Sequence, residues 1–233
     1  MASTRFPGKP LAELCGKPMV QWVFEAAVQS GVGDRVIIAT PDVEIAEACR
    51  AFGAESALTR GDHPSGTDRL AEVAQTQEAD VYINLQGDEP LIPPLSIAAC
   101  AAPLLDDPGV QMSSVYSDCA ESELDDPSVV KVVLDQEGYA LYFSRYPVPY
   151  PRNARTEPVR KHVGIYGFRR EALAAFSTWS QTPLEQAESL EQLRFLEHGI
   201  RIKMAYGAGT EMAVDTPEQA EQVRRILALR SAT

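Results

Sequence analysis

The stretch 79–92 most limits the folds that this chain can adopt, because a short apolar run there changes abruptly into an acidic turn. The run Val-Tyr-Ile-Asn-Leu at 81–85 is rich in β-branched and aromatic residues and predicts a strand buried on both faces. The turn Gln-Gly-Asp-Glu-Pro at 86–90 therefore lies at the carboxyl end of a strand, where open α/β sheets bind ligands. Asp88 can anchor a metal or phosphate site there, because its carboxylate suits a hard cation. The alternative is an ordinary strand-to-helix turn in which Pro90 ends the strand.

Strand-like and helix-like segments alternate through the first half of the chain. Capping residues and apolar periodicity predict helices at 18–30, 43–52 and 67–76. Short β-branched runs predict strands at 36–40 and 57–59. This alternation is typical of parallel βαβ units, so we expect an α/β fold.

The second half of the chain is richer in β-structure. Segments 129–135 and 139–143 flank Gln-Glu-Gly and predict a hairpin, and 161–168 predicts a further strand. Leucine and alanine residues about three positions apart predict one strong helix over 183–198, and 200–204 predicts a strand after it.

The composition of the chain indicates which kinds of binding partner and which cellular compartment to expect. The chain has 233 residues and a formal net charge of -12, which argues against nucleic acid or an anionic membrane as partner, because both need a basic face. Its four cysteines lie far apart without metal-ligand spacing, which is typical of free thiols in a reducing compartment. Neither a signal peptide nor an apolar run of membrane-spanning length is evident, so we expect a cytoplasmic protein without membrane insertion.

Two polar loops offer groups for a phosphorylated ligand. In the first, hydroxyls and backbone amides can surround a phosphate while Arg5 and Lys9 supply positive charge. The alternative there is a solvated basic terminus. In the second loop, 60–69, hydroxyls and Arg69 can hold a base or a sugar. The alternative is a surface loop that ends with Thr67 as the N-cap of a helix.

Three further features are each open to two interpretations. Asp215 begins Asp-Thr-Pro-Glu, which is typical of a helix start with Thr216 as the cap and Pro217 in the first turn, or it supplies a second ligand carboxylate. His162 suits a structural histidine as well as a ligand-binding one. One face of the helix expected at 183–198 carries polar side chains that either converge on a ligand or are solvated: Glu185, Glu188 and Gln192.

Several blocks from the first residue to about Arg225 together carry a family resemblance. They are Ala-Ser-Thr-Arg-Phe-Pro-Gly-Lys-Pro-Leu at 2–11, Ser-Gly-Thr-Asp-Arg at 65–69, the segments 84–90 and 130–145, His-Val-Gly-Ile-Tyr-Gly-Phe at 162–168, Leu-Glu-Gln-Leu-Arg at 190–194, and Val-Asp-Thr-Pro-Glu at 214–218. In this order they resemble the 3-deoxy-manno-octulosonate (Kdo) cytidylyltransferases. A set of blocks in the family's order is more specific than any single motif.

The resemblance implies an enzyme that couples CTP to Kdo, giving CMP-Kdo and pyrophosphate for lipopolysaccharide synthesis. It also implies a Rossmann-like nucleotidyltransferase sheet in a single domain over 1–233. A smaller antiparallel β region at about 120–170 would serve sugar binding and dimerisation of a homodimer. No protein nucleophile is needed, because the anomeric hydroxyl of Kdo attacks the α-phosphorus of CTP.

The resemblance also implies roles for individual residues. Lys9, Asp88 and Asp215 would be catalytic, with the two aspartates as ligands of Mg²⁺. The residues implied to hold CTP are Ser3, Arg5, Lys9, Ser65, Arg69 and Gln86. Those implied to hold Kdo are Arg69, Gln86, Arg145, His162, Tyr166, Glu188 and Gln192.

One departure from the family concerns the start of the chain. Relatives begin with an apolar strand and Pro-Ala-Arg before the segment that corresponds to Met1. Either the start was set late, or the fragment is incomplete, or the protein tolerates a missing central strand. We expect one of the first two, because losing a central strand would unpair its neighbours and expose core.

Two other functions stay open on the sequence. One is the activation of a related acidic sugar, such as 8-amino-Kdo or a sialic-acid-like sugar. The other is a non-catalytic, nucleotide-binding dimeric protein. The number of metal ions is open as well.

Overall fold

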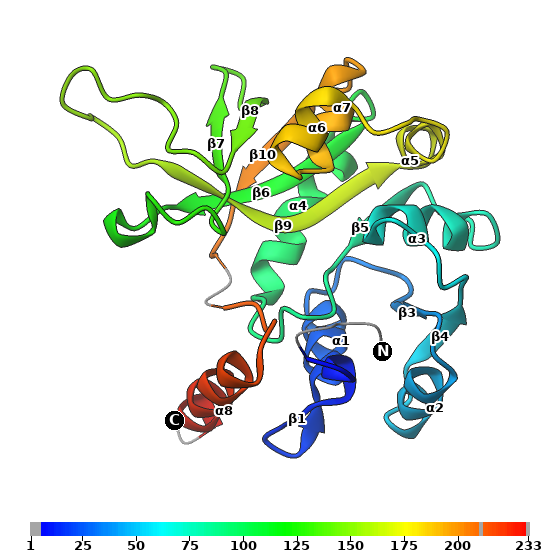
Figure 1. Cartoon of the computed structure of the whole chain (residues 1–233). Helices are drawn as coiled ribbons and strands as arrows, with labels where there is room; N and C mark the ends of the chain where they lie inside the picture. The colour runs from blue at the N-terminus through cyan, green and yellow to red at the C-terminus, as the bar shows by residue number, and fades with distance from the viewer. Residues whose placement is uncertain (1–5, 210–211, 232–233) are drawn as a thin grey trace. The chain divides into compact units, whose positions relative to one another are not determined.

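Alternating strands and helices divide between two compact units (Figure 1). The computed structural model describes residues 6–209 and 212–231. The first unit comprises residues 1–76, 85–97 and 210–233, and the second comprises 77–84 and 98–209. The prediction of a single domain stays a prediction.

The first unit is built mainly from helices and short strand pairs. Its elements are a 3-10 turn η1 (Lys9–Leu11), β1 (Glu13–Leu14), β2 (Lys17–Pro18), α1 (Met19–Gln29), β3 (Ile37–Thr40), α2 (Val43–Ala51), β4 (Glu55–Leu58), α3 (Gly66–Ala74) and α8 (Pro217–Ser231). Strands β3 and β4 pair in parallel around α2, which confirms the βαβ pattern expected there.

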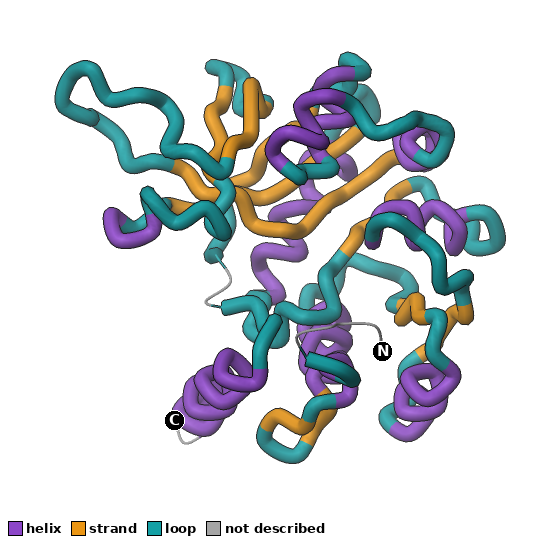
Figure 2. Tube along the Cα trace, in the orientation of Figure 1, coloured by secondary structure: helices purple, strands orange, loops and turns teal. Residues whose placement is uncertain are grey.

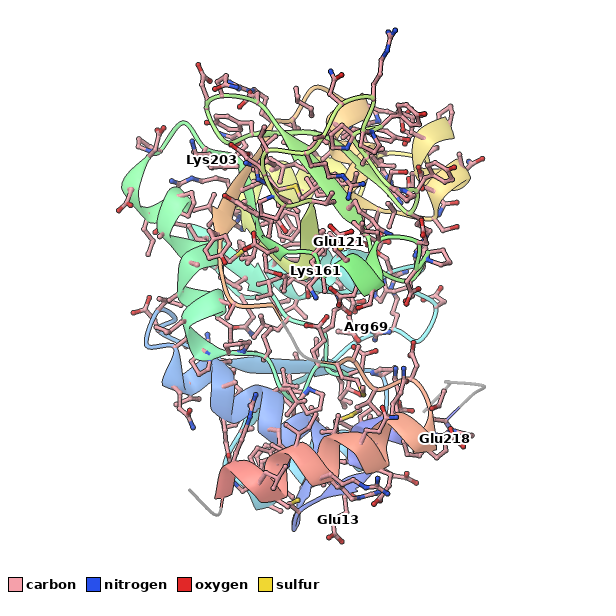
Figure 3. The ribbon with its side chains drawn as sticks, turned by 90° about the vertical axis from the view of Figure 1, so that its left-hand side faces the viewer. Glu13, Arg69, Glu121, Lys161, Lys203 and Glu218 are labelled. Carbon is pink, nitrogen blue, oxygen red and sulfur yellow. The ribbon has the colours of Figure 1, made fainter. Side chains whose placement is uncertain are left out.

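Helix α8 packs on residues from the start of the chain. Leu14, Met19 and Leu91 share a buried apolar cluster with Val223 and Leu227 of α8. The β1–β2 hairpin, on which Figure 3 marks Glu13, is tied to α8 because Arg224 Nε donates to the Glu13 carbonyl at 2.9 Å. Segments from both ends of the sequence therefore share one core in this unit.

The second unit contains a six-stranded mixed sheet (Figure 2). Its elements are β5 (Val81–Asn84), most of α4 (Pro94–Asp106), β6 (Met112–Asp118), η2 (Glu121–Glu123), β7 (Lys131–Leu134), β8 (Ala140–Ser144), β9 (Arg160–Arg169), α5 (Arg170–Phe176), α6 (Pro183–Glu188), α7 (Gln192–Glu197) and β10 (Ile202–Tyr206). Strand β9 is central, since β6 pairs along one edge while β7 and β5 pair with its two halves on the other. The expected hairpin is β7–β8. The predicted dimerisation role of this region stays a prediction.

Helices cover both faces of this sheet. Gly167 of β9 lies under α4, and a Cβ built on it would come within 2.5 Å of Leu104 Cδ1 and of Ser113 Oγ, so only glycine allows this packing. On the opposite face, Phe168 of β9 stacks on Phe195 of α7 with a centroid distance of 5.4 Å. The fold is therefore α/β with a mixed sheet, as the fold class predicted.

The structure corrects three local expectations. The single helix expected over 183–198 is wrong: Ser189 adopts a left-handed conformation at φ 52° and separates α6 from α7. Strand β5 is not in a parallel pair, because its partner β9 runs antiparallel. Ser65, rather than Thr67, is the N-cap of α3, since its Oγ accepts from Asp68 N at 3.2 Å.

The structure describes the four cysteines and the helices to which the composition drew attention. Cys15, Cys49, Cys100 and Cys119 are free thiols. Within residues 6–209 and 212–231, no helix combines the length and the apolar character that crossing a membrane requires.

The break between α6 and α7 brings together a buried ion pair. Arg194 Nε donates to Glu185 Oε2 at 2.7 Å, and its guanidinium lies 4.0 Å from the centre of the Phe176 ring. The two charged side chains are 4% and 5% exposed. Each charge therefore depends on the other for compensation.

We expect Glu185→Ala to lower the free energy of unfolding by about 3–5 kcal/mol, because Arg194 would stay buried without its partner. Urea denaturation measures this change. Glu157→Ala is the control, since Glu157 pairs with Arg160 at an exposed position, and its effect should stay below about 1 kcal/mol. Equal losses in the two variants would contradict the assignment.

Candidate functional site

The ammonium group of Lys9 lies between two carboxylates that are far apart in the sequence. Lys9 Nζ donates to Asp88 Oδ2 at 2.6 Å, to Asp215 Oδ1 at 2.9 Å and to the Val214 carbonyl at 3.1 Å. The Lys9 side chain is 15% exposed, whereas those of Asp88 and Asp215 are 30% and 40% exposed, so a ligand can reach the carboxylates from solvent. All three lie in the first unit, which thus gathers the residues expected to be catalytic.

Backbone geometry places each member of this cluster. Gly8, at φ 72°, turns the chain into η1 and brings Lys9 to the site. The Val214 amide donates to the Asp88 carbonyl at 2.8 Å, which joins the acidic turn to the segment that precedes α8. Asp88 and Asp215 are therefore held together by the main chain as well as by Lys9.

Capping of α8 falls to Thr216. The Gln219 amide donates to Thr216 Oγ1 at 3.3 Å, and Gln219 Oε1 in turn accepts from the Thr216 amide at 3.0 Å. This reciprocal pair is a capping box. The carboxylate of Asp215 is directed to Lys9 instead, so the capping interpretation of the sequence applies to Thr216 and not to Asp215.

Burial and neighbouring charges shift the pKa values of Lys9 and of Glu89, which follows Asp88 in the chain. Burial alone would lower the pKa of Lys9, but the hydrogen bonds and charges of Asp88 and Asp215 outweigh it and raise the pKa above 10.5. Burial, with a contribution from the charge of Asp88, raises the pKa of Glu89 to about 7. Lys9 therefore stays charged at neutral pH and compensates the two aspartates.

The loop before α3 is organised by Arg69, whose position Figure 3 marks. Its Nη1 donates to Thr59 Oγ1 at 2.5 Å and to the Arg60 carbonyl at 3.1 Å. Ser65 caps α3 and donates to Asp68 Oδ2 at 2.8 Å. Arg69, Ser65 and the half-buried Gln86 thus lie in the first unit, and their predicted ligand contacts stay predictions.

The remaining nucleotide-binding prediction falls on the start of the chain. Ser3 and Arg5 lie outside the described residues.

A second polar cluster lies in the second unit, on β9 and α7. Tyr166 Oη donates to Gln192 Oε1 at 3.1 Å, and both residues are buried. The Gln192 Nε2 has no hydrogen-bond partner within the described residues. The ring of His162 lies between Phe143 and Tyr166, with centroid distances of 5.1 and 5.3 Å. This cluster unites three of the residues predicted to hold the sugar.

Arg145 and Glu188, also predicted to contact sugar, bind each other and the main chain. Arg145 Nε donates to the Glu188 carbonyl at 2.7 Å, and its Nη1 and Nη2 donate to the carbonyls of Pro127 and Ser189 at 2.8 and 3.3 Å. The Glu188 carboxylate accepts from Ser144 Oγ at 2.7 Å and from the Arg145 amide at 2.9 Å. These contacts anchor the end of α6, and the roles of both residues in sugar binding stay predictions.

Sequence reasoning missed two buried polar residues beside this cluster. Ser114 Oγ lies 2.8 Å from His162 Nε2, and Lys131 Nζ donates to the carbonyls of Asp126 and Arg145 at 2.7 and 3.2 Å. Both are fully buried. No pattern in the sequence could single them out, because a serine or lysine within a strand is usual on a solvated face.

Comparison with known proteins identifies the family. The Cytidylyltransferase family model matches residues 1–202. The 3-deoxy-manno-octulosonate cytidylyltransferase of Escherichia coli is 47% identical over 226 residues, which cover 97% of this chain and 92% of that protein. The chain belongs to the cytidylyltransferase family. The protein of the same name from Geobacter metallireducens is also 47% identical, over 95% of this chain and 92% of the relative.

Solved structures agree with this assignment. The structure of a CMP:2-keto-3-deoxy-manno-octonic acid synthetase complexed with CTP matches with a TM-score of 0.95 and 46% identity, covering 98% of this chain and 95% of that one. A putative glucose-1-phosphate thymidylyltransferase from Bacillus anthracis has a TM-score of 0.66 at 13% identity, which shows a shared fold alone. The resemblance found in the sequence, and the expectation of a nucleotidyltransferase, are therefore confirmed.

The environment of His162 predicts a specific dependence of stability on pH. Burial lowers the pKa of His162 to about 3, whereas an unfolded histidine has a pKa of about 6.5. Between these values the unfolded state binds the additional proton, so stability is full above about pH 6.5 and falls as the pH drops towards 3.

We expect His162→Gln to remove this dependence. Between pH 7.5 and pH 5.0 the wild type should lose about 2 kcal/mol more stability than the variant, because each pH unit below 6.5 is worth about 1.4 kcal/mol. Urea denaturation at the two pH values tests this. Parallel losses in the two proteins would show that His162 is not buried in its neutral form.

Proposed function

We propose that this chain transfers the cytidylyl group of CTP to 3-deoxy-manno-octulosonate, with release of pyrophosphate. Relatives that match nearly the whole chain are named for this acceptor, and the structural neighbour was solved with CTP. The observation that carries the proposal is the Lys9 ammonium between Asp88 and Asp215. A site of this charge pattern is suited to a triphosphate and the cation that accompanies it.

We propose Mg²⁺ as the cofactor, held by Asp88 and Asp215. The donor set fits this ion, because Mg²⁺ binds carboxylate oxygen and commonly needs one or two protein carboxylates, with substrate oxygens and water completing its shell. Both carboxylates contact the same nitrogen, so they can face one cation. Residues 6–209 and 212–231 contain no cluster of three or more acidic, histidine or cysteine side chains that could hold a metal alone. Such an ion would supply electrostatic stabilisation of the charge on the phosphate oxygens.

The residues of the first unit supply charge and position. The hydroxyl at the anomeric carbon of the sugar attacks the α-phosphorus of CTP and loses its proton to water, while the bond to the leaving pyrophosphate breaks, so no protein nucleophile takes part. Negative charge grows on the bridging and leaving oxygens during this step. Lys9, which stays protonated at neutral pH, can donate to these oxygens and so offset the negative charge that grows on them.

The residues of the second unit fit an acidic sugar. The buried Gln192 Nε2 is a donor without a partner in the described part of the chain, while Tyr166 and His162 place further polar atoms beside it. A buried amide donor left unsatisfied is unfavourable unless a ligand completes it. A carboxylate or hydroxyl oxygen of the sugar would satisfy this donor.

Pyrophosphate release tests the proposal. The chain is incubated with Mg²⁺ and CTP, and with Kdo, its 8-amino analogue or a sialic acid as acceptor. Release that requires CTP and Kdo supports the proposal, and a chelator should abolish it until Mg²⁺ is restored. Release only with another acceptor would replace Kdo by that sugar, and no release with any acceptor would contradict the assigned reaction.

The cation and carboxylates of the first unit should be essential to turnover. We expect Lys9→Met, Asp88→Asn and Asp215→Asn each to lower kcat by about 10²–10³, because each removes charge that acts on the transition state. Asp34→Asn changes an exposed aspartate in the same unit and serves as the control. Circular dichroism should show all four variants folded, and near-normal kcat in a site variant would contradict its role.

The sugar-binding role of Gln192 can be separated from catalysis. We expect Gln192→Leu to raise KM for the sugar about tenfold and to leave KM for CTP unchanged, because it removes one buried hydrogen bond to the sugar. Gln186→Leu is the matched control, since Gln186 lies exposed on α6. Steady-state kinetics with each substrate varied in turn decide the point, and equal KM values for the sugar in the two variants would count against Gln192.

A further inference from the structure

The hydroxyl of Ser114 lies between the His162 ring and a main-chain carbonyl. Ser114 Oγ is 2.8 Å from His162 Nε2 and 2.7 Å from the Ile165 carbonyl oxygen. Ser114 is fully buried, so water does not compete for these two contacts. Both contacts have the length of good hydrogen bonds.

The number of protons available on Ser114 fixes which atom donates in each of its two hydrogen bonds. A serine hydroxyl has one proton, and a carbonyl oxygen can only accept. The Ser114 proton is therefore directed to Ile165 O. Ser114 Oγ then faces His162 with a lone pair, so His162 Nε2 must carry the proton that makes this contact a hydrogen bond.

An irregularity between β6 and β9 makes this arrangement possible. Ser114 lies opposite Tyr166 in the register, whereas the next residue, Val115, lies opposite Val163. Gly164 and Ile165 therefore have no residue opposite them on β6, and the Ile165 carbonyl is available to Ser114. Bulges of this kind re-aim side chains and recur near functional sites.

The other ring nitrogen of His162 is left as an acceptor. Burial lowers the pKa of His162 to about 3, so the ring is neutral at physiological pH. A neutral imidazole that is protonated at Nε2 has a lone pair at Nδ1. Among the residues that the structure describes, none donates a hydrogen bond to this Nδ1.

We propose that Ser114 is a positioning residue, which holds His162 in the Nε2-protonated tautomer so that Nδ1 accepts a hydrogen bond from a hydroxyl of the acidic sugar. This inference rests on the proposed function for the identity of the ligand. Nδ1 as an acceptor cannot bind the sugar carboxylate, which has no proton to donate at neutral pH. The carboxylate must therefore contact donors elsewhere, of which Gln192 Nε2 is one with no partner in the described residues.

The tautomer can be measured without any substrate. The chain has three histidines, so a ¹⁵N-histidine spectrum that correlates ring nitrogens with ring carbon-bound protons is simple to assign with a His162→Gln sample. At pH 7.5 the wild type should show His162 protonated at Nε2 and unprotonated at Nδ1. Protonation at Nδ1, or at both nitrogens, would overturn the proposal.

Two serine variants test whether Ser114 acts through His162. Ser114→Ala should raise KM for the sugar about tenfold with kcat for saturating sugar nearly unchanged, because it releases one hydrogen bond that orients the ring. It should also speed exchange of the His162 Nε2 proton with water.

Ser113→Ala is the matched control. Ser113 is the neighbouring buried serine of β6, but its hydroxyl donates to the Cys100 carbonyl at 2.6 Å, away from His162. It should leave both the KM for the sugar and the His162 signals unchanged. Equal effects of the two variants on KM and proton exchange would overturn the positioning role.

The readouts distinguish failure of this inference from failure of the proposed function. If no acidic sugar supports pyrophosphate release, the proposed function fails, while the tautomer and the proton exchange of His162 still test the action of Ser114. If Ser114→Ala does not fold, the wild-type spectrum alone still decides the tautomer. If the enzyme is active and the wild-type tautomer is protonated at Nδ1, only the present inference fails.

Discussion

The first unit depends on one charge relation, the Lys9 ammonium shared by Asp88 and Asp215. Two carboxylates that face the same point repel each other, so the folded chain needs a cation between them. Lys9 supplies it, and the hydrogen bond between the Val214 amide and the Asp88 carbonyl holds the two acidic segments in place. The Asp88 and Asp215 carboxylates are partly exposed while the Lys9 side chain is mostly buried, so this cluster is open to solvent from the side of the carboxylates.

In the second unit, the side chains that are held together are polar but neutral. Strand β9 lies at the centre of its sheet and is bonded on both edges, which gives it a rigid frame. Where its register against β6 slips, polar atoms that a regular strand would use for pairing become available to side chains. His162 and Tyr166 lie on β9 on either side of this slip, and Gln192 of α7 accepts a hydrogen bond from Tyr166. In both units a main-chain irregularity, a left-handed Gly8 or a bulge in β9, aims the groups that a ligand would meet.

Prediction from the sequence succeeded where a local rule was enough. The apolar run and acidic turn at 81–90, the capping signature at 215–218 and the β7–β8 hairpin all appear in the structure near their predicted positions. It failed where distant contacts override local preference. The leucine spacing over 183–198 fits one helix, yet the chain breaks at Ser189, and Arg194 and Glu185 pair across the break. Similarly, nothing near Val81 to Asn84 reveals that its partner β9 runs antiparallel, because pairing direction is set by a strand far along the chain.

The sequence by itself determined the family and the α/β class and singled out the residues of the candidate site, because ordered sequence blocks and local capping patterns can be recognised without knowledge of tertiary contacts. It left Asp215 open between a cap and a ligand. Only the tertiary structure decided that Thr216 takes the cap and that Asp215 joins Asp88 at Lys9, since that choice depends on a contact between segments remote in the chain. Ser114 shows the same limit more sharply. Its hydroxyl donates to a carbonyl of β9 and accepts from a ring nitrogen of His162, and these two partners lie beside Ser114 only because β6 and β9 are paired.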